Sequence, residues 1–209
     1  MPQPILATTL GDMPRESVSP PVVARHDPAW QTRGSALAHE LRQALAPRAL
    51  RVEHIGSTAI PGMAAKPVLD LQISVRELRE AARAFDRPLA ERGFARTVFE
   101  QDHVPAGRED PPELWRKRVW TRRAHPGGDV NLHARVIDAP NERLALLFRD
   151  WFRAHPEAVP AYARFKSLLA DAVGDPGLYT DVKDPVVDLI VTVAESWAAD
   201  TSWTPPPPL

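Results

Sequence analysis

The segment 68–75 alternates between apolar and polar side chains, and this pattern constrains the fold more than any other feature of the sequence. Successive side chains of a β-strand point to opposite faces, so each face of this strand has its own character. One face carries the apolar side chains of Leu69, Leu71, Ile73 and Val75. The other carries Asp70, Gln72 and Ser74. We therefore expect a sheet with one face against a hydrophobic core and with Asp70 on a polar face.

Helix and strand patterns are mixed along the rest of the chain, without the regular βαβ alternation of a doubly wound sheet. Apolar residues at helical spacing predict helices over 33–46, 76–92, 141–154, 158–173 and 185–199. Extended patterns predict strands over 52–55 and 94–99, and a hairpin of 114–122 with 130–136 across Pro126-Gly127-Gly128. These elements favour the α+β class: a mixed β-sheet with helices packed on one side and a C-terminal helical segment.

The length of 209 residues suits one domain with a single buried core. Residues 1–20 are rich in Pro, Ser and Thr and are expected to form a flexible N-terminal arm. The domain is expected to span 21–200. Residues 201–209 contain the run Pro205 to Pro208 and are expected to form a Pro-rich tail.

The composition excludes several kinds of chemistry. With 26 basic and 27 acidic residues, no overall positive field makes a nucleic acid an obligatory partner. The absence of cysteine excludes disulfides, thiolate metal sites and a thiol nucleophile, so any catalysis must use oxygen and nitrogen groups. No segment approaches about 18 uninterrupted apolar residues, which predicts that no helix spans a membrane. The N-terminal residues do not resemble a secretory signal, so we expect a cytoplasmic protein.

A small-residue turn follows the strand predicted at 52–55. Gly56, Ser57 and Thr58 supply backbone N–H groups and hydroxyls that can cradle a phosphate, and glycine lets an anion approach the main chain. A Gly-Ser pair alone is usually an ordinary turn. Here Asp70 arrives on the next strand, and a carboxylate that holds Mg²⁺ beside anion-binding donors is what nucleotidyl transfer requires.

At this point the sequence resembles the GrpB family, a branch of the nucleotidyltransferase superfamily also found attached to some dephospho-CoA kinases. The main motif is HIGSTAIPGMAAKPVLDLQISV at 54–75. One shorter motif lies upstream of it, His26-Asp27-Pro28-Ala29-Trp30. Others lie downstream, all in family order over about 20–199: Asn131-Leu132-His133, Leu147-Phe148-Arg149-Asp150, His155-Pro156, Tyr162, Lys166, Tyr179 and Lys183. The resemblance implies a nucleotidyltransferase-like fold.

The resemblance also implies roles for particular residues. In the superfamily, acids after a Gly-Ser turn hold two Mg²⁺ ions, which bind a nucleoside triphosphate such as ATP and activate an acceptor hydroxyl. Gly56 and Ser57 match the turn, and Asp70 matches the first acid. Gln72 stands at the place of the second acid, and the third is Asp129 or is missing. An amide supplies no charge, so the metal site would be weak unless the substrate brings phosphates of its own.

Other polar residues are candidates with structural alternatives. Lys66 can contact a phosphate or can be solvated. The basic cluster of Lys117, Arg118, Arg122 and Arg123 near the hairpin can receive phosphates or acidic substrate groups, or can form surface ion pairs. His133 can act as an acid or base beside Asn131, or can be structural.

Three further residues are expected near the substrate, again with structural alternatives. His54 can touch a substrate, although bracing of the turn is the expected role. Tyr179 and Lys183 lie one helical turn apart and can close over a pocket or form a surface pair.

Three functions remain open from the sequence. The leading one is an enzyme that binds a nucleoside triphosphate with Mg²⁺ and transfers a group to, or activates, a small-molecule acceptor. The second is a module that binds a nucleotide or metabolite without catalysis, which Gln72 favours. The third is a metal-independent enzyme that uses Asp70 or His133 as a general base. A protein partner or an association with a kinase is left open.

Overall fold

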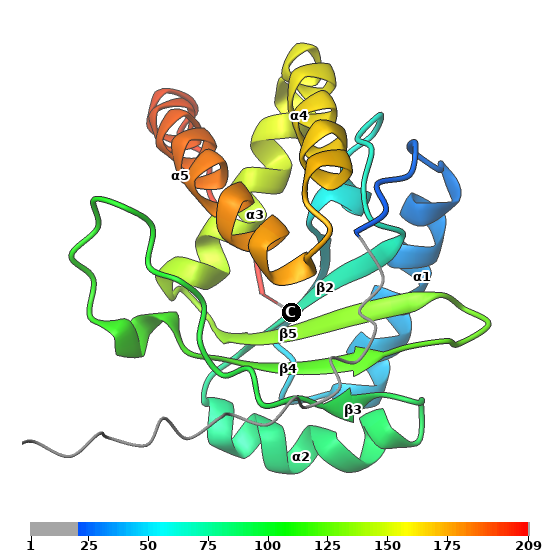
Figure 1. The fold of residues 1–209 in the computed structure, drawn as a ribbon. Helices are drawn as coiled ribbons and strands as arrows, with labels where there is room; N and C mark the ends of the chain where they lie inside the picture. The colour runs from blue at the N-terminus through cyan, green and yellow to red at the C-terminus, as the bar shows by residue number, and fades with distance from the viewer. Residues whose placement is uncertain (1–20, 209) are drawn as a thin grey trace, which may run out of the picture.

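A computed structural model describes residues 21–208 as one sheet covered by helices (Figure 1). The strands are β1 Arg51–Ile55, β2 Val68–Val75, β3 Ala95–Arg96, β4 Lys117–Arg122 and β5 Asp129–Val136. The helices are α1 Ala29–Leu45, α2 Leu78–Ala90, α3 Pro140–Ala154, α4 Val159–Ala172 and α5 Pro176–Thr201. Short 3-10 turns cover Ser57–Ala59, Pro112–Trp115 and Pro156–Ala158. The predicted arm at 1–20 and the last residue of the predicted tail lie outside the described residues.

The sheet has the strand order β1-β2-β5-β4-β3 and is mixed. The central strands β2 and β5 run parallel, whereas β1 with β2, β4 with β5 and β3 with β4 are antiparallel. The register places Asp70 opposite Asn131 and Gln72 opposite His133. The predicted α+β class, the mixed sheet and the hairpin of β4 with β5 are confirmed, and the parallel pairing brings the family motifs of β2 and β5 side by side.

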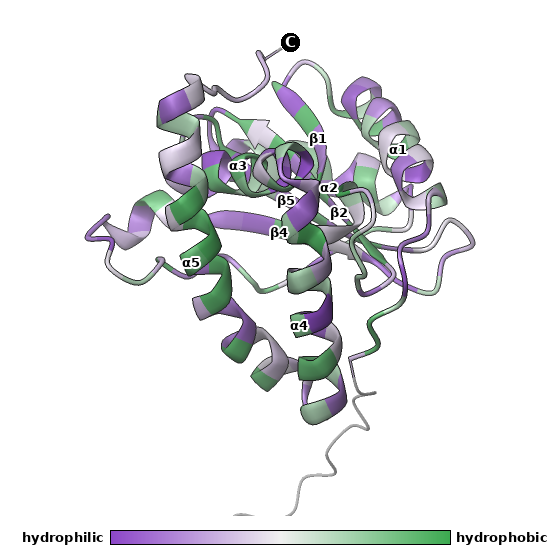
Figure 2. Ribbon diagram, turned by 90° about the horizontal axis from the view of Figure 1, so that it is seen from above, coloured by the Kyte–Doolittle hydropathy of each residue, from purple (hydrophilic) through white to green (hydrophobic). Residues whose placement is uncertain are grey.

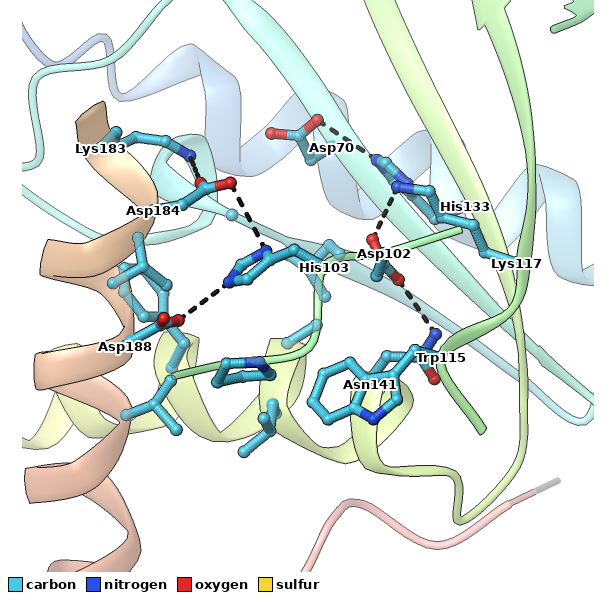
Figure 3. A pocket seen from close by; sticks show the side chains of 18 of the residues that line it. Asp70, Asp102, His103, Trp115, Lys117, His133, Asn141, Lys183, Asp184 and Asp188 are labelled. Atoms are coloured by element: carbon cyan, nitrogen blue, oxygen red, sulfur yellow. Dashed lines mark hydrogen bonds and ion pairs between the residues drawn. The ribbon is translucent and has the colours of Figure 1, made fainter. Parts of the chain in front are cut away.

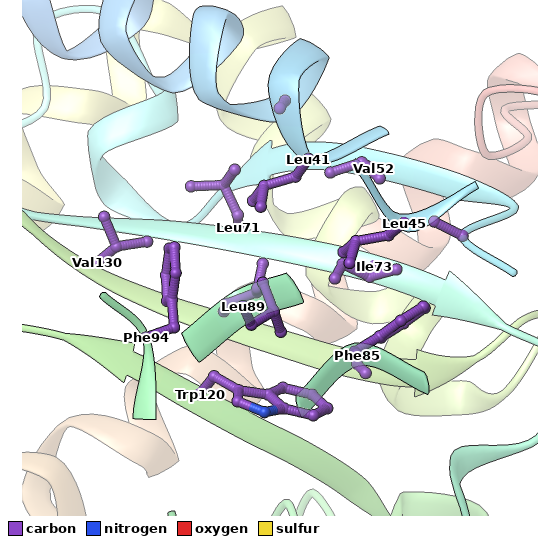
Figure 4. Close-up of a cluster of buried hydrophobic side chains, with 14 of the residues drawn as sticks. Leu41, Leu45, Val52, Leu71, Ile73, Phe85, Leu89, Phe94, Trp120 and Val130 are labelled. Atoms are coloured by element: carbon purple, nitrogen blue, oxygen red, sulfur yellow. The ribbon is translucent and has the colours of Figure 1, made fainter. Parts of the chain in front are cut away.

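The main core lies between the sheet and the helices α1 and α2 (Figure 4). As predicted from the alternation, Leu69, Leu71 and Ile73 point into it and are at most 3% exposed. Trp120 of β4 is 1% exposed there and donates from Nε1 to Asp86 Oδ1 at 3.0 Å. The buried indole N–H is thus satisfied, and it adds no unpaired polar group to the core.

Helices cover both faces of the sheet, so the expectation that they pack on one side is wrong. Figure 1 shows α3, α4 and α5 on the face opposite α2, and Figure 2 shows α4 and α5 beside each other above the sheet. The polar face of β2 is therefore covered. Gln72 and Ser74 are at most 1% exposed, while Asp70 keeps access to a cavity.

Two helices begin earlier than the apolar spacing indicates. Helix α1 starts at Ala29, because Asp27 accepts a hydrogen bond from the Ala29 N–H at 2.9 Å. Helix α5 starts at Pro176, where Asp175 Oδ1 accepts from the Leu178 N–H, and it continues through Pro185. The sequence predicts a helix that begins at residue 185, but Pro185 lies inside α5, although proline usually begins or breaks a helix.

Among the described residues, no helix combines the length and the apolar character that a membrane span requires, as the composition predicts. The cytoplasmic location stays a prediction.

Gly34 of α1 is needed because the ring of His54 packs against it. A Cβ added at Gly34 would lie 2.2 Å from His54 Nδ1. Alanine normally stabilises a helix relative to glycine, but here we expect Gly34→Ala to destabilise the protein by about 1 to 3 kcal/mol through overpacking. Denaturant unfolding measures the change. Gly174→Ala is the control, since its added Cβ meets nothing within 4 Å; equal effects of the two variants would contradict the packing argument.

Candidate functional site

Gly56 brings the turn after β1 against the carboxylate of β2. Its φ of 68° and ψ of −170° lie in a region that is essentially open to glycine alone. A Cβ at this position would lie 2.7 Å from Asp70 Oδ2 and 3.0 Å from Asp70 Cβ. Both the backbone conformation and the close approach of Asp70 therefore require glycine, and the approach of a phosphate that the sequence predicts there stays a prediction.

Side chains from the helices α3 and α4 hold this turn from behind. Lys166 of α4 donates from Nζ to Ser57 Oγ at 2.8 Å and to the Ala64 carbonyl at 2.6 Å. Arg153 of α3 donates twice to the Ala59 carbonyl, at 3.0 and 2.9 Å. These bonds fix the main chain around Ser57 before any ligand arrives.

His54 also braces the turn, and it does not face the cavity. Its Nε2 lies 2.9 Å from Thr58 Oγ1, and both residues are at most 4% exposed. Burial lowers the pKa of His54 from 6.5 to about 4, with Asp70 opposing and Arg153 and Arg149 assisting the shift. The bracing role of His54 is therefore the one that its position supports. Thr58 is predicted to bind phosphate, but its hydroxyl is hydrogen-bonded to His54 instead.

Asp70 stands at the junction of the turn and the sheet. Its Oδ1 accepts from Asn131 Nδ2 at 2.8 Å and lies 3.8 Å from His133 Nε2, and its side chain is 31% exposed. Burial would raise the pKa of Asp70, but His133, Asn131 and Lys183 together hold it below its usual value. Asp70 is therefore ionised at neutral pH. Burial lowers the pKa of His133, with Arg135 and Lys117 assisting and Asp70 opposing, which favours the neutral imidazole.

A cavity of about 580 Å³ opens above Asp70, between the sheet and the helices α3 and α5 (Figure 3). Six residues predicted from the sequence to bind or react line it together: Gly56, Ser57, Asp70, Asn131, His133 and Lys183. Lys117, the first residue of β4, lines it as well. Part of the wall is apolar, where Trp115, Leu144, Val187 and Val191 belong to one hydrophobic cluster. The cavity thus offers charged and polar groups around Asp70 and an apolar surface at this cluster.

Two predicted residues flank the cavity rather than line it. Lys66 Nζ lies 4.1 Å from the centre of the Tyr179 ring, and Lys183 of α5 and Asp70 both act on the pKa of Lys66. Burial lowers that pKa first, and repulsion by Lys183 lowers it further. Lys66 is therefore close to the same group of charges.

Three predicted site residues lie away from the cavity, and their assignments are corrected here. Gln72 is 1% exposed; its Oε1 accepts from Arg135 at 2.6 Å and its Nε2 donates to the Glu142 carbonyl. Arg118 points to the opposite face of β4 from Lys117 and lies 3.3 Å from Glu100. Asp129 belongs to the hairpin turn, where its Oδ1 accepts from the Ala124 N–H at 2.9 Å.

The site does not fit the two-ion arrangement that the resemblance implies. Among residues 21–208, no group of three or more His, Asp and Glu side chains is placed to hold a metal ion. The amide oxygen of Gln72 is occupied by Arg135, and Asp129 is engaged in its turn. Asp70 is the carboxylate that remains at the Gly-Ser turn, and one carboxylate is a weak site for Mg²⁺.

Several cavity residues were missed because they come from segments without a motif. Asp102 and His103 lie in the proline-rich stretch interpreted only as a loop. Asp102 accepts from Lys117 at 2.6 Å and from Arg135 at 2.8 Å, and these cations hold its pKa well below the usual range against the effect of burial. His103 bridges Asp184 and Asp188 of α5 at 3.5 and 2.9 Å (Figure 3).

The use of lysine was a sequence signal that could have located the site. The chain has four lysines among its 26 basic residues, namely Lys66, Lys117, Lys166 and Lys183. Two of them line the cavity, one hydrogen-bonds Ser57, and one stacks on Tyr179 beside it. Lys166 is 3% exposed, and burial with repulsion by Lys183 lowers its pKa to about 7.

The fold and cavity define an α+β protein in which a Gly-Ser turn and a strand carboxylate open onto one cavity. A family model described as GrpB protein matches residues 20–192. The chain belongs to the GrpB family. The structure of the conserved protein GrpB from Enterococcus faecalis matches it with a TM-score of 0.65 and 26% identity, over 84% of this chain and 99% of that one.

Curated relatives include proteins of two kinds. The dephospho-CoA kinase of Mycolicibacterium paratuberculosis is 37% identical over 198 residues, covering 86% of this chain and 47% of the kinase. The chain thus spans about half the length of such relatives. The UPF0157 protein BH1888 of Halalkalibacterium halodurans is 29% identical over 189 residues, covering 90% of this chain and 89% of that protein.

Replacement of Gly56 should lower the free energy of unfolding by more than its positive φ alone explains. In Gly56→Ala, the new Cβ would displace Asp70 in addition to the backbone cost of about 1 to 3 kcal/mol. Gly107→Ala is the control, because φ is 84° there and nothing lies within 4 Å of the added Cβ. We expect a larger loss of unfolding free energy for Gly56→Ala, measured by denaturant unfolding; similar losses would contradict the close approach.

The pKa of His54 predicts a pH dependence of stability. Its folded-state pKa of about 4 lies below the unfolded value of 6.5, so the unfolded chain binds more protons between these values. The free energy of unfolding should therefore fall as the pH is lowered from about 6.5 towards 4, by up to about 1.4 kcal/mol per pH unit. Denaturant unfolding across this range should show a shallower slope for His54→Asn, with the slope due to His133 remaining. An unchanged slope would show that His54 is not the titrating group.

Proposed function

We propose that this protein binds the phosphate chain of a nucleoside triphosphate at the Gly56-Ser57 end of the cavity and transfers a group from it to a small-molecule acceptor. The observation that carries the proposal is the gathering of all four lysines of the chain at or beside one cavity. Lysine is a compact point charge suited to phosphate oxygens. A nucleotidyltransferase-like enzyme with an acceptor in the rest of the cavity is consistent with this arrangement.

The charges near the turn support binding of an anion. Lys183 repels both Lys66 and Lys166, and Asp70 is the carboxylate that attracts both of them. Lys183 also lies 3.5 Å from Asp184, which neutralises part of this charge. Phosphate oxygens placed among these ammonium groups would relieve the repulsion, and each charged hydrogen bond would contribute about 1.5 to 3 kcal/mol.

The proposal assigns Mg²⁺ a limited role. Because the described residues do not fit a two-ion site, Mg²⁺ would come with the triphosphate as its counter-ion, and Asp70 is the residue that would hold it. The cavity volume of about 580 Å³ suits a nucleotide-sized ligand. The apolar end near Trp115 and Val191 is where the base or the acceptor would lie.

A second candidate is a nucleotide- or metabolite-binding module without catalysis. It is favoured by Gln72, whose amide is fully engaged with Arg135 and Glu142 at the place of the second acid. Such a module would use the same lysines and would bind the nucleotide without turnover. The two candidates therefore share their binding test and differ in product formation.

Calorimetric titration of ATP, with and without Mg²⁺, tests the proposal. We expect Lys183→Met to weaken binding about 10- to 100-fold through the loss of a charged contact. Asp70→Asn should remove the dependence on Mg²⁺. Arg118→Met is the control, because this cation next to Lys117 points to the other face of the sheet and should leave binding unchanged.

Product analysis of the same mixtures separates the candidates. Release of pyrophosphate or phosphate supports the enzyme, whereas binding without turnover supports the module. No binding of ATP, or an equal loss in Arg118→Met and Lys183→Met, would overturn the proposed site.

A further inference from the structure

The contact between Ser57 and Lys166 joins a hydroxyl in the cavity wall to a buried amine. Ser57 lines the cavity, while Lys166 reaches it from behind and is 3% exposed. Their Oγ and Nζ atoms are 2.8 Å apart, and among the described residues Ser57 Oγ has no other hydrogen-bond partner. A serine held this way against an amine is open to a ligand on one side and to a proton acceptor on the other.

Within residues 21–208, Lys166 has hydrogen-bond acceptors but no anionic partner that would hold it as a permanent cation. Among the described residues no carboxylate lies within ion-pair distance of Nζ, and its other contacts are the Ala64 carbonyl and the Tyr162 ring, whose centre is 5.0 Å away. Lys183 from α5 faces it with a like charge, and Asp70 from β2 attracts it only at longer range. With a pKa of about 7, lowered first by burial, much of Lys166 is a neutral amine at neutral pH.

We propose that Ser57 and Lys166 form a nucleophilic dyad in which Ser57 Oγ attacks the phosphorus of a phosphoanhydride bound in the cavity. This inference rests on the proposed phosphate site. Pairs of serine and lysine are an established solution for activating a hydroxyl without histidine. In the ammonium form Lys166 donates to Ser57 Oγ, whereas in the neutral form the Ser57 hydroxyl donates to the Nζ lone pair and the amine keeps its donor bond to the Ala64 carbonyl. In the reaction this lone pair receives the serine proton.

The step balances as a substitution at phosphorus. The Ser57 Oγ–H bond breaks and its proton passes to Lys166 Nζ. The Oγ–P bond forms while the P–O bond to the departing phosphate group breaks, and that oxygen keeps the electron pair. Lys183, which lines the same end of the cavity, is placed to stabilise the negative charge of the departing group. The product is a phosphorylated serine with a protonated Lys166.

A fluorophosphonate probe tests the dyad independently of nucleotide binding, because phosphorus is attacked with loss of fluoride. Mass spectrometry of the intact protein and its peptides should find one adduct, on Ser57. Its rate of formation should rise about tenfold per pH unit below the pKa of Lys166 and level off above it. Ser57→Ala should abolish the adduct. Ser167→Ala is the control: it removes the serine that follows Lys166 in α4 and should leave the adduct unchanged.

Variants of Lys166 distinguish a role as general base from a purely structural role. Lys166→Met should lower the rate at least about 100-fold, and Lys166→Arg, which keeps the charge and donors but cannot act as a base, should lower it equally. Circular dichroism and thermal unfolding identify variants that are not folded. For these, the wild-type pH profile of labelling remains the deciding measurement.

Three results would overturn the dyad. The first is a wild-type Ser57 that the probe does not label, and the second is a rate with no dependence on pH between about 6 and 8. The third is retention of the rate in Lys166→Arg, which would assign Lys166 a structural role. The calorimetric titration of ATP distinguishes failure of the dyad from failure of the phosphate site. If ATP binds but Ser57 is unreactive, the dyad is wrong and the proposed phosphate site stands.

Discussion

The close approach of Gly56 to Asp70 is the constraint on which the rest of the site depends. A glycine in this conformation lets the turn after β1 lie against the carboxylate of β2, with 2.7 Å between the place of a Cβ and Asp70 Oδ2. The turn then presents Ser57 to the cavity, and Lys166 reaches its hydroxyl from behind. The same residues therefore set the geometry of the turn, on which both the proposed anion site and the proposed reactivity of Ser57 depend.

A buried polar layer supports this arrangement from below. Glu142 is fully buried and accepts from Arg51 and Ser74, both at 2.5 Å, while Gln72 joins Arg135 to the Glu142 carbonyl. Burying such charges is costly unless each is paired, and removal of one partner leaves an uncompensated charge. On this face of β2, the side chains of Gln72 and Ser74 thus have a structural role. Asp70 is the one whose side chain is open to the cavity.

Much of the fold was predictable from local pattern. The alternation of β2, the hairpin turn and the helical stripes follow directly from side-chain periodicity, and the family motif located Gly56, Ser57 and Asp70. The covering of both sheet faces was not predictable in this way, because Gln72 and Ser74 read as exposed polar residues until their partners Arg135 and Glu142, from distant segments, are known.

The same limit applies to the candidate site. Asp102 and His103 lie in a proline-rich loop without periodicity, and only the tertiary structure brings them to Lys117 and α5. The resemblance offers Asp129 as a possible third acid beside Asp70, but in the structure its carboxylate accepts a hydrogen bond within the hairpin turn. Contacts between distant segments therefore decided which polar residues line the cavity.

The small number of lysines permits a direct test of the central claim. Nuclear magnetic resonance of protein with isotopically labelled lysine should resolve four side-chain signals, and each amine can be titrated before and after addition of inorganic triphosphate. We predict that Lys166 titrates near 7 in the free protein, that triphosphate shifts the signals of Lys66, Lys166 and Lys183 with one saturation curve, and that the bound anion raises the pKa of Lys166. Signals that do not respond to triphosphate, with Lys166 titrating at the ordinary value of about 10.4, would contradict the account.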